Sequence, residues 1–329
     1  MKLIIATFVI AIAGVVALGQ APTLQIVTAD PNLPSELYYG NVKVKPLRVR
    51  PGTNPPQFIT IDDSDFFTQQ NYVDFLNRMP DSGGFQFWLG QINQCGANGP
   101  CLEVQRISVS ASFFLSIEFQ QTGYLVERTY KSAFGNAPNA MSTFGGTHSV
   151  VAPIVRFSEF IPDVKQIGQG VIVLQPGWDT LLENNKVAYF NSFVQRTRFT
   201  SKYPPASTTP ATFVDGLFAT AQVTPSSSER SAAIAEFSGA GDITNVAARA
   251  KALRDVADNP TLTNAELNRA FVLMQYYGYL RRDPDNGNGD TDYTGYDFWL
   301  TKLNQFNGNY INAEMVKAFL SSVEYRNRF

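Results

Sequence analysis

Two stretches near the ends of this 329-residue chain carry the same three landmarks in the same order. Each has a Pro-Asp pair, then an aromatic-Trp pair, then a closing segment of the form Phe-x2-Ser-x-Glu-aromatic. Corresponding landmarks lie 204, 211 and 206 positions apart, so insertions and deletions fall only between the landmarks. This pattern predicts a duplicated module. We expect a structural role for Pro80, Asp81, Trp88 and Glu118 in the first copy, and for Pro284, Asp285, Trp299 and Glu324 in the second.

A helical spacing precedes each Pro-Asp pair. Tyr72 and Leu76 lead to Pro80 in steps of four, as Tyr276 and Leu280 lead to Pro284, and weaker versions end at Pro138 and Pro225. An apolar pair at i and i+4 is one face of a helix, and proline ends a helix just before itself. We predict a mostly α fold, a helical array of duplicated helix-turn-helix modules with a short extended N-terminal arm. The two landmark tryptophans are expected to be buried in equivalent pockets.

The first nineteen residues have the form of a secretory signal peptide. Lys2 precedes an apolar run over residues 3–18, and small residues precede a cut after Gly19. The alternative is a membrane anchor, but this run is shorter than the ~20 residues that a spanning helix needs. We expect a secreted protein of the periplasm, cell surface or extracellular space, with no transmembrane segment in the mature chain.

Changes in composition divide the chain into regions. Segment 42–50 alternates apolar and basic residues, which is typical of a strand, and Pro46 restricts it to an edge strand or an isolated arm. Such an arm must pair with another extended segment of the chain, lie along a helical groove or pair with a neighbouring molecule. The predicted regions are a signal peptide (1–19), an extended Pro-rich arm (20–61), the N-terminal repeat (62–138), an ordered connector (139–178), a middle helical region (179–265) and the C-terminal repeat (266–329).

The chain has two cysteines, Cys95 and Cys101, separated by a turn-forming Gly-Ala-Asn-Gly-Pro stretch. An even pair this close in an exported protein predicts a disulfide. The second copy has no cysteines at this place, so we interpret the bridge as an accessory that holds the loop between two helices.

Composition also argues against several function classes. A formal net charge of −2 gives no basic footprint for nucleic acid. His148 is the only histidine and no nucleophile motif surrounds it, so neither a Ser-His-Asp nor a Cys-His machine is expected. A zinc site would need more His or Cys ligands. The acidic landmarks recur in both copies, which favours a structural role over a pair of catalytic carboxylates, and we name no catalytic residue.

One loop of the second copy is rich in oxygen-bearing side chains. Asp290, Asp292, Thr294 and Gly295 match the first, third, fifth and sixth positions of a calcium loop. The twelfth position is Thr301, so the bidentate carboxylate is missing. We therefore favour a polar loop whose last Asp or Thr caps the following helix. Asp290, Asp292 and Thr294 remain the candidate calcium ligands, and no other cofactor is expected.

The landmark pattern resembles that of secreted bacterial proteins with the domain of unknown function 4214, which is similar to the phycobilisome linker domain. Their usual form is Tyr-x3-Leu-Gly-Arg-x-Pro-Asp, then glycine and an aromatic-Trp pair, then Phe-Leu-x-Ser-x-Glu-Tyr. Asn77 and Arg281 stand where glycine is usual, and the loop before Gly295 is longer. The resemblance covers most of residues 62–329. It implies an all-helical exported domain with no established catalytic residues.

These features lead us to expect an exported, non-enzymatic structural or protein-interaction module of the bacterial envelope or extracellular matrix. It would bind a protein partner or self-assemble. One alternative is a carboxylate-dependent enzyme that acts on polysaccharide, which needs a cleft with two carboxyl groups within about 10 Å and an acid of raised pKa. Another is a calcium- or glycan-binding adhesion module, with envelope polysaccharide as its ligand. An aromatic patch on a helical array would favour interaction.

Overall fold

The computed structural model describes residues 24–27, 36–39, 42–45, 48–49, 57–285 and 290–329. The chain divides into two compact units, Met1–Phe58 and Ile59–Phe329. The predicted signal peptide lies outside the described residues. Within the described part of the chain, none of the helices is both long enough and apolar enough to span a membrane.

Short strands make up the described part of the first unit. β1 (Leu24–Val27), β2 (Glu36–Tyr39) and β3 (Val42–Lys45) form an antiparallel sheet in that order, and β4 (Arg48–Val49) pairs with β5 (Phe58–Ile59). β3 and β4 both lie in the segment whose alternation predicts a strand. They are not isolated, because each pairs with another extended segment of the same chain and so satisfies backbone hydrogen bonds.

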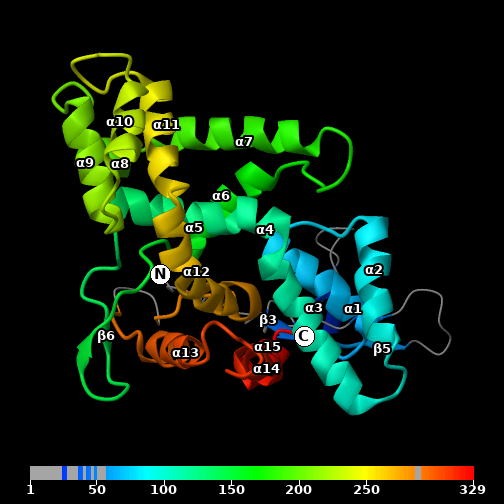
Figure 1. Cartoon of the computed structure of the whole chain (residues 1–329). Coiled ribbons are helices and arrows are strands. Elements are labelled where there is room, and N and C mark those ends of the chain that lie inside the picture. Colours follow the sequence, from blue (N-terminus) through cyan, green and yellow to red (C-terminus); the bar gives the residue numbers. More distant parts are fainter. Residues whose placement is uncertain (1–23, 28–35, 40–41, 46–47, 50–56, 286–289) are drawn as a thin grey trace, which may run out of the picture. The chain divides into compact units, whose positions relative to one another are not determined.

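The second unit is mostly helical, which confirms the predicted mostly α fold. Its central helix is α5 (Gly123–Phe134), in which all residues but the last are buried, and Figure 1 shows it crossing the middle of this unit. Helices α6, α9, α11 and α12 contact α5. The other helical elements are α1 (Ser64–Asn71), η1 (Tyr72–Leu76), α2 (Ser82–Asn93), α3 (Gly99–Leu115), α4 (Ile117–Gln121), α6 (Phe157–Gly168), α7 (Trp178–Phe193), α8 (Thr197–Lys202), α9 (Pro210–Ala221), α10 (Ser227–Ala235), α11 (Val246–Ala257), α12 (Pro260–Met274), η2 (Gln275–Leu280), α13 (Thr294–Gln305), α14 (Met315–Ser321) and α15 (Val323–Arg326).

Polar side chains set where several helices begin. Asn98 accepts a hydrogen bond from the N–H of Cys101 at the start of α3, and Asn259 accepts one from Thr261 at the start of α12. Ser226 caps α10 and accepts from the N–H of Glu229. Such caps satisfy N–H groups that the first turn of a helix leaves without a partner.

The first helix of each repeat ends in a π-helical turn, where α1 continues into η1 and α12 continues into η2. The residues that follow, Asn77 and Arg281, have left-handed backbone conformations with φ of 54° and 56°. Glycine adopts this conformation without a steric penalty. The backbone therefore explains why glycine is usual at both of these positions in the pattern that the sequence resembles.

The two repeats contact each other through corresponding residues. The rings of Phe75 and Tyr279 meet edge to face, with centroids 5.2 Å apart. Phe75 also lies 6.4 Å from Phe113 and Tyr279 lies 6.2 Å from Phe319, both with an interplanar angle of 31°. Contact between corresponding residues is typical of a two-fold interface. These contacts join the two stretches through residues at equivalent places in the landmark pattern.

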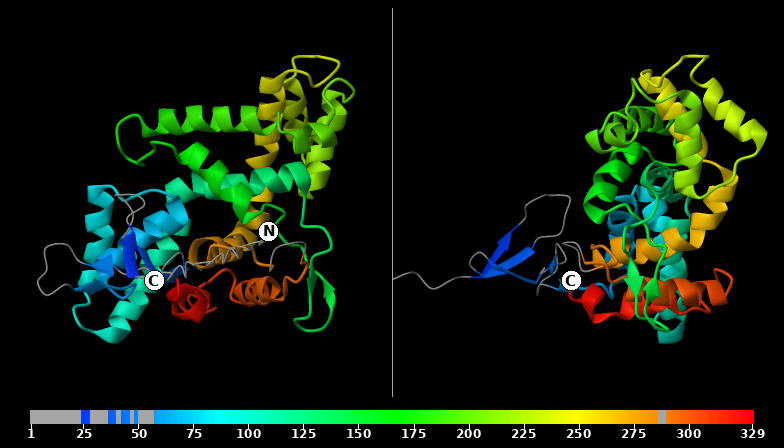
Figure 2. Two further views of the ribbon diagram at one scale, coloured as in Figure 1. Left: turned by 180° about the vertical axis from the view of Figure 1, so that it is seen from behind. Right: turned by 90° about the vertical axis from the view of Figure 1, so that its left-hand side faces the viewer.

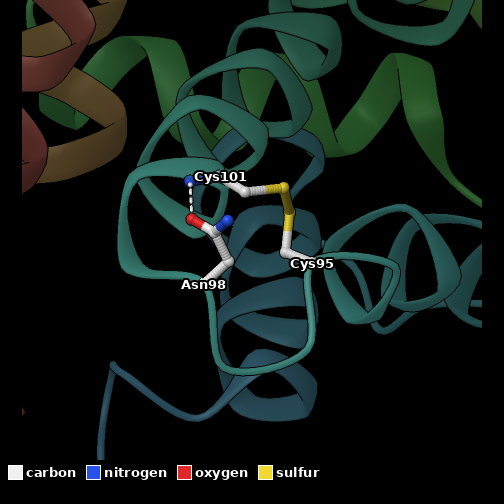
Figure 3. Close-up of a disulfide and its surroundings, with 3 residues drawn as sticks. All are labelled: Cys95, Asn98 and Cys101. Carbon is white, nitrogen blue, oxygen red and sulfur yellow. Dashed lines mark hydrogen bonds between the residues drawn. A yellow bond between two sulfur atoms is a disulfide. The ribbon is translucent and has the colours of Figure 1, made fainter.

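Cys95 and Cys101 form a disulfide, as their spacing predicts, with Cα atoms 5.5 Å apart. The bridge closes the loop between α2 and α3, and the side chain of Asn98 accepts the N–H of Cys101 inside that loop at 3.1 Å (Figure 3). The loop is thus fixed both covalently and by a helix cap.

The connector contains more regular structure than the sequence suggests. It holds a short hairpin of β6 (Met141–Ser142) and β7 (His148–Ser149), followed by helix α6. Pro162 lies inside α6, beyond the first turn where proline is normally tolerated, and so it hides the helical signal. The long helical stretch before residue 135 breaks at Ser116 and again at Thr122.

We predict that Phe75→Ala lowers the free energy of unfolding by about 3–5 kcal/mol, because it removes a buried ring at the contact between the repeats. Phe87→Ala is the matched control, since Phe87 is 57% exposed, and its effect should stay within about 0.5 kcal/mol. Urea unfolding followed by far-UV circular dichroism measures both. Equal effects of the two substitutions would contradict the central role of Phe75.

Candidate functional site

Landmark residues of the N-terminal repeat gather around one aromatic cluster. Tyr72 meets Phe113 edge to face at 4.8 Å, and Trp88 lies 5.7 Å from Phe113. A Cβ atom at Gly84 would collide with the hydroxyl of Tyr72, so the glycine of the pattern is required by this close approach. Burial, and then the Asp81 carboxylate, raise the pKa of Tyr72 to about 12. Its hydroxyl therefore stays protonated at neutral pH and does not act as a base.

An arginine–glutamate pair joins the two ends of the pattern in this repeat. Arg78 donates from Nε and Nη2 to the Glu118 carboxylate at 2.6 and 2.7 Å. Its guanidinium also lies over the ring of Tyr72, 5.0 Å from the centroid, and within 3.5 Å of Asp81. Bidentate charged hydrogen bonds of this kind are strong and geometrically specific. The pair therefore holds the turn after η1 against α4.

The same contacts recur in the C-terminal repeat. Arg282 donates to Glu324 at 2.6 and 3.1 Å and lies over the ring of Tyr276 at 5.4 Å. Phe319 lies 5.3 Å from Tyr276 and 5.6 Å from Trp299. A Cβ atom at Gly295 would collide with the Tyr276 hydroxyl, as one at Gly84 would with Tyr72. These matches agree with the predicted equivalence of the repeats, and their common origin stays a prediction.

A cavity lies beside each tryptophan. Both indoles are half-buried and not fully buried as we expected, because each forms part of a cavity wall. The first cavity has a volume of about 500 Å³ and the second about 190 Å³. Three large apolar side chains of the first cavity are exposed to solvent: Phe87 by 57%, Ile117 by 53% and Leu174 by 83%.

The aspartates of the two Pro-Asp landmarks make different contacts. Asp81 caps α2 by accepting the N–H of Gly84 at 2.8 Å, as predicted for an aspartate in that place. Asp285 does not cap α13, and it is instead buried against Arg156 of the connector at 2.7 Å. The longer loop that follows Pro284 separates Asp285 from the start of its helix, which explains the difference.

The candidate calcium ligands bond to the backbone of their own loop. Asp290 accepts the N–H of Asp292, and Asp292 accepts the N–H of Thr294, each at 2.9 Å. The Thr294 hydroxyl accepts the N–H of Thr143 at 3.0 Å. Among the described residues, no group of three or more acidic, histidine or cysteine side chains could hold a metal ion. The arrangement matches the polar-loop alternative, since Asp292 binds the first residue of α13.

His148 lies in the connector hairpin and faces α13. Its Nε2 is 3.2 Å from an Asp297 carboxylate oxygen, and its Nδ1 is 2.8 Å from the carbonyl oxygen of Gly146. The side chain of Asp297 is mostly buried and that of His148 is half exposed. The approach of His148 to Asp297 thus joins the hairpin to the helix.

A buried cluster of charged residues on α5 and α12 was not identified from the sequence. Glu266 accepts from Arg269 at 2.7 Å and lies 3.6 Å from Lys131. Burial, and then the Glu266 carboxylate, raise the pKa of Glu127 well above its ordinary value. Neither carboxylate lines the cavities described here. Charged residues spaced by four on a helix normally form a solvated face, so the sequence carried no signal for this cluster.

We predict that Glu118→Gln destabilises the protein by about 2–3 kcal/mol, because Arg78 loses its charged partner in a mostly buried setting. Glu324→Gln is the matched control in the C-terminal repeat and should cost no more than about 1 kcal/mol. The side chain of Glu118 is 6% exposed and that of Glu324 is 47% exposed. Urea unfolding midpoints of the two variants compare the pairs directly. Equal losses would show that burial does not distinguish them.

A second prediction concerns the Glu127 carboxyl. Because burial raises its pKa, the folded protein keeps this proton at pH values at which the unfolded chain has lost it. As pH rises above the ordinary value near 4.5, the unfolded chain loses this proton first and unfolding becomes more favourable. This contribution lowers stability by up to about 1.4 kcal/mol per pH unit until the raised pKa is reached.

Glu127→Gln removes the titration, so the variant should gain stability relative to the wild type as the pH rises from 5 to 8. Urea unfolding of both proteins at each pH gives the difference and cancels the contribution of other groups. A difference that does not change with pH would contradict the raised pKa.

Comparison with models of protein families, with curated proteins and with solved structures found no match for this chain.

Proposed function

We propose that this chain is an exported, non-enzymatic protein-interaction module of the bacterial envelope or extracellular matrix, and that the surface beside Trp88 binds its partner. The observation that carries the proposal is the exposed apolar cluster of Phe87, Ile117 and Leu174. These side chains come from three separate segments and line one cavity of about 500 Å³. Exposed apolar clusters of this kind are typical of interaction sites.

The charged residues of the cavity support a protein ligand over a glycan. Arg78, Asp81 and Glu118 bond to one another and to neighbouring backbone groups. They therefore offer few free groups to sugar hydroxyls, whereas the exposed apolar side chains remain open to a partner. The arginine–glutamate pair is thus best explained as a support for the site and not as its ligand-binding group.

Backbone strain supports the same location. Leu174 has φ of 73°, in the left-handed region that residues other than glycine rarely adopt. Strained residues of this kind cluster at binding sites, where the surrounding structure holds them in place. A strained leucine that is also exposed at the cavity rim has no evident role in packing.

The enzyme and adhesion alternatives have less support. A polysaccharide-acting enzyme needs carboxyl groups that face a cleft. Burial raises the pKa of the Glu127 and Asp255 carboxyls, and neither lines the cavities beside the tryptophans. The candidate calcium ligands are engaged with the backbone of their loop. Export is supported by the N-terminal sequence and by the disulfide, which persists in oxidising compartments.

The test places a photo-reactive phenylalanine analogue at position 87 or 174 of the full chain in the cells that export it. The control places it at position 187, an exposed valine of α7. We expect discrete, protease-sensitive adducts at 87 and 174 that are absent at 187. Protease-resistant adducts of broad mass would support glycan adhesion instead, and no specific adduct at either position would overturn the proposal. Adducts that also form in the purified protein alone would identify the partner as a second copy.

A further inference from the structure

The hairpin of β6 and β7 covers one face of α13 in the C-terminal repeat (Figure 1). Phe144 of the hairpin meets Phe298 edge to face at 5.2 Å with an interplanar angle of 88°. The N–H of Thr143 bonds to the Thr294 hydroxyl at 3.0 Å, and His148 approaches Asp297 at 3.2 Å. Residues 294, 297 and 298 lie at i, i+3 and i+4, so the hairpin covers a single stripe of the helix.

Backbone hydrogen bonds hold the hairpin in this place. The N–H of Met141 donates to the carbonyl of Thr291, and the N–H of Tyr293 donates to the carbonyl of Met141, both at 2.8 Å. An extended segment has thus been added beside the start of the helix, and Figure 2 shows the two elements side by side from further directions. In the second repeat, a hairpin of the same chain is therefore bound to the helix α13 by both backbone and side-chain contacts.

Within the part of the chain that the structure describes, the corresponding stripe of α2 in the N-terminal repeat is exposed. The offset that relates Trp299 to Trp88 relates the covered stripe to Gly83, Gln86 and Phe87. All three of these residues are exposed, whereas Thr294 is half-buried and Asp297 is buried. Phe298 is 36% exposed and Phe87 is 57% exposed. Phe87 and Trp88 keep the geometry of their counterparts, with ring centroids 4.8 Å apart against 4.9 Å for Phe298 and Trp299. The aromatic pair is thus shared by the two helices, but Gly83 and Gln86 stand where α13 has Thr294 and Asp297.

We infer that the Gly83, Gln86 and Phe87 stripe of α2 binds an extended, hairpin-like segment of another protein that presents an aromatic side chain edge-on to Phe87. The inference rests on the proposed function and names the chemistry of its partner. The chain's own hairpin on α13 is the template for this occupant. Aromatic rings favour such edge-to-face contacts, and the exposed Ile117 and Leu174 extend the apolar surface beside them.

The residue at the position of Asp297 differs between the stripes, and this difference determines which polar groups of a partner can bind there. Asp297 faces His148 in the C-terminal repeat, but the corresponding residue of α2 is Gln86. An amide both donates and accepts hydrogen bonds and carries no charge. A partner residue opposite Gln86 can therefore donate to the amide or accept from it, but Gln86 has no carboxylate to attract a positive charge.

The test uses a cyclised peptide with the hairpin sequence of residues 139–151, in which a photo-reactive phenylalanine analogue replaces the residue at position 144. It is cross-linked to the full mature protein, and the labelled peptide fragments are mapped by mass spectrometry. We expect saturable labelling of α2, which the unmodified peptide competes. A competitor with alanine in place of that phenylalanine should be at least about tenfold weaker.

Protein variants provide the controls. Phe87→Ala should abolish the labelling of α2, Phe87→Tyr should preserve it, and Val187→Ala should leave it unchanged. Circular dichroism confirms that each variant is folded. Labelling confined to α13, labelling that Phe87→Ala does not alter, or no saturable labelling would each overturn the inference.

This outcome is separable from the test of the proposed function. Protein adducts at position 87 in cells, together with failure of the peptide, would mean that the partner lacks the aromatic hairpin. Peptide binding without adducts in cells would instead count against the proposed function.

Discussion

The contact between Phe75 and Tyr279 brings together segments that are two hundred residues apart, and the architecture of the second unit depends on it. The rings meet at 5.2 Å, and Tyr279 also hydrogen bonds through its hydroxyl to Ser110 at 2.5 Å. Beside them, the mostly buried carboxylate of Asp74 pairs with Arg328 near the end of the chain. Closing so long a loop costs entropy. A compact set of aromatic, hydrogen-bond and charged contacts offsets that cost and fixes how the repeats face each other.

The arginine–glutamate pair shows how one local arrangement behaves in two environments. In both repeats it ties the left-handed turn after a π-helical segment to the helix of the closing segment. In the N-terminal repeat α4 is followed directly by the central helix α5, and the pair is mostly buried. In the C-terminal repeat the side chains of Arg282 and Glu324 are 39% and 47% exposed. The contact is the same, but surrounding structure decides how much it contributes.

The asymmetry between the repeats is more informative about function than their similarity. A shared fold explains the shared tyrosine, glycine, tryptophan and arginine positions, because those residues contact one another. It does not explain an exposed Phe87 or a strained, exposed Leu174. The connector hairpin packs a ring against Phe298, which is 36% exposed, whereas the equivalent Phe87 is 57% exposed. Two stretches with the same landmark contacts thus differ in how far their equivalent phenylalanines are exposed.

The sequence by itself determined the features that depend on neighbours along the chain. Spacings of four residues predicted the helices that end before Pro80 and Pro284, and the short Cys-x5-Cys spacing predicted the disulfide. Other features depended on packing between distant segments. These are the pairing of Arg78 with Glu118, forty residues away, the burial of Glu127 beside Glu266, and the hairpin on α13. No local pattern encodes them, because a charged or aromatic side chain looks the same in sequence whether solvent or another helix covers it. Only the tertiary structure decides which of the two surrounds it.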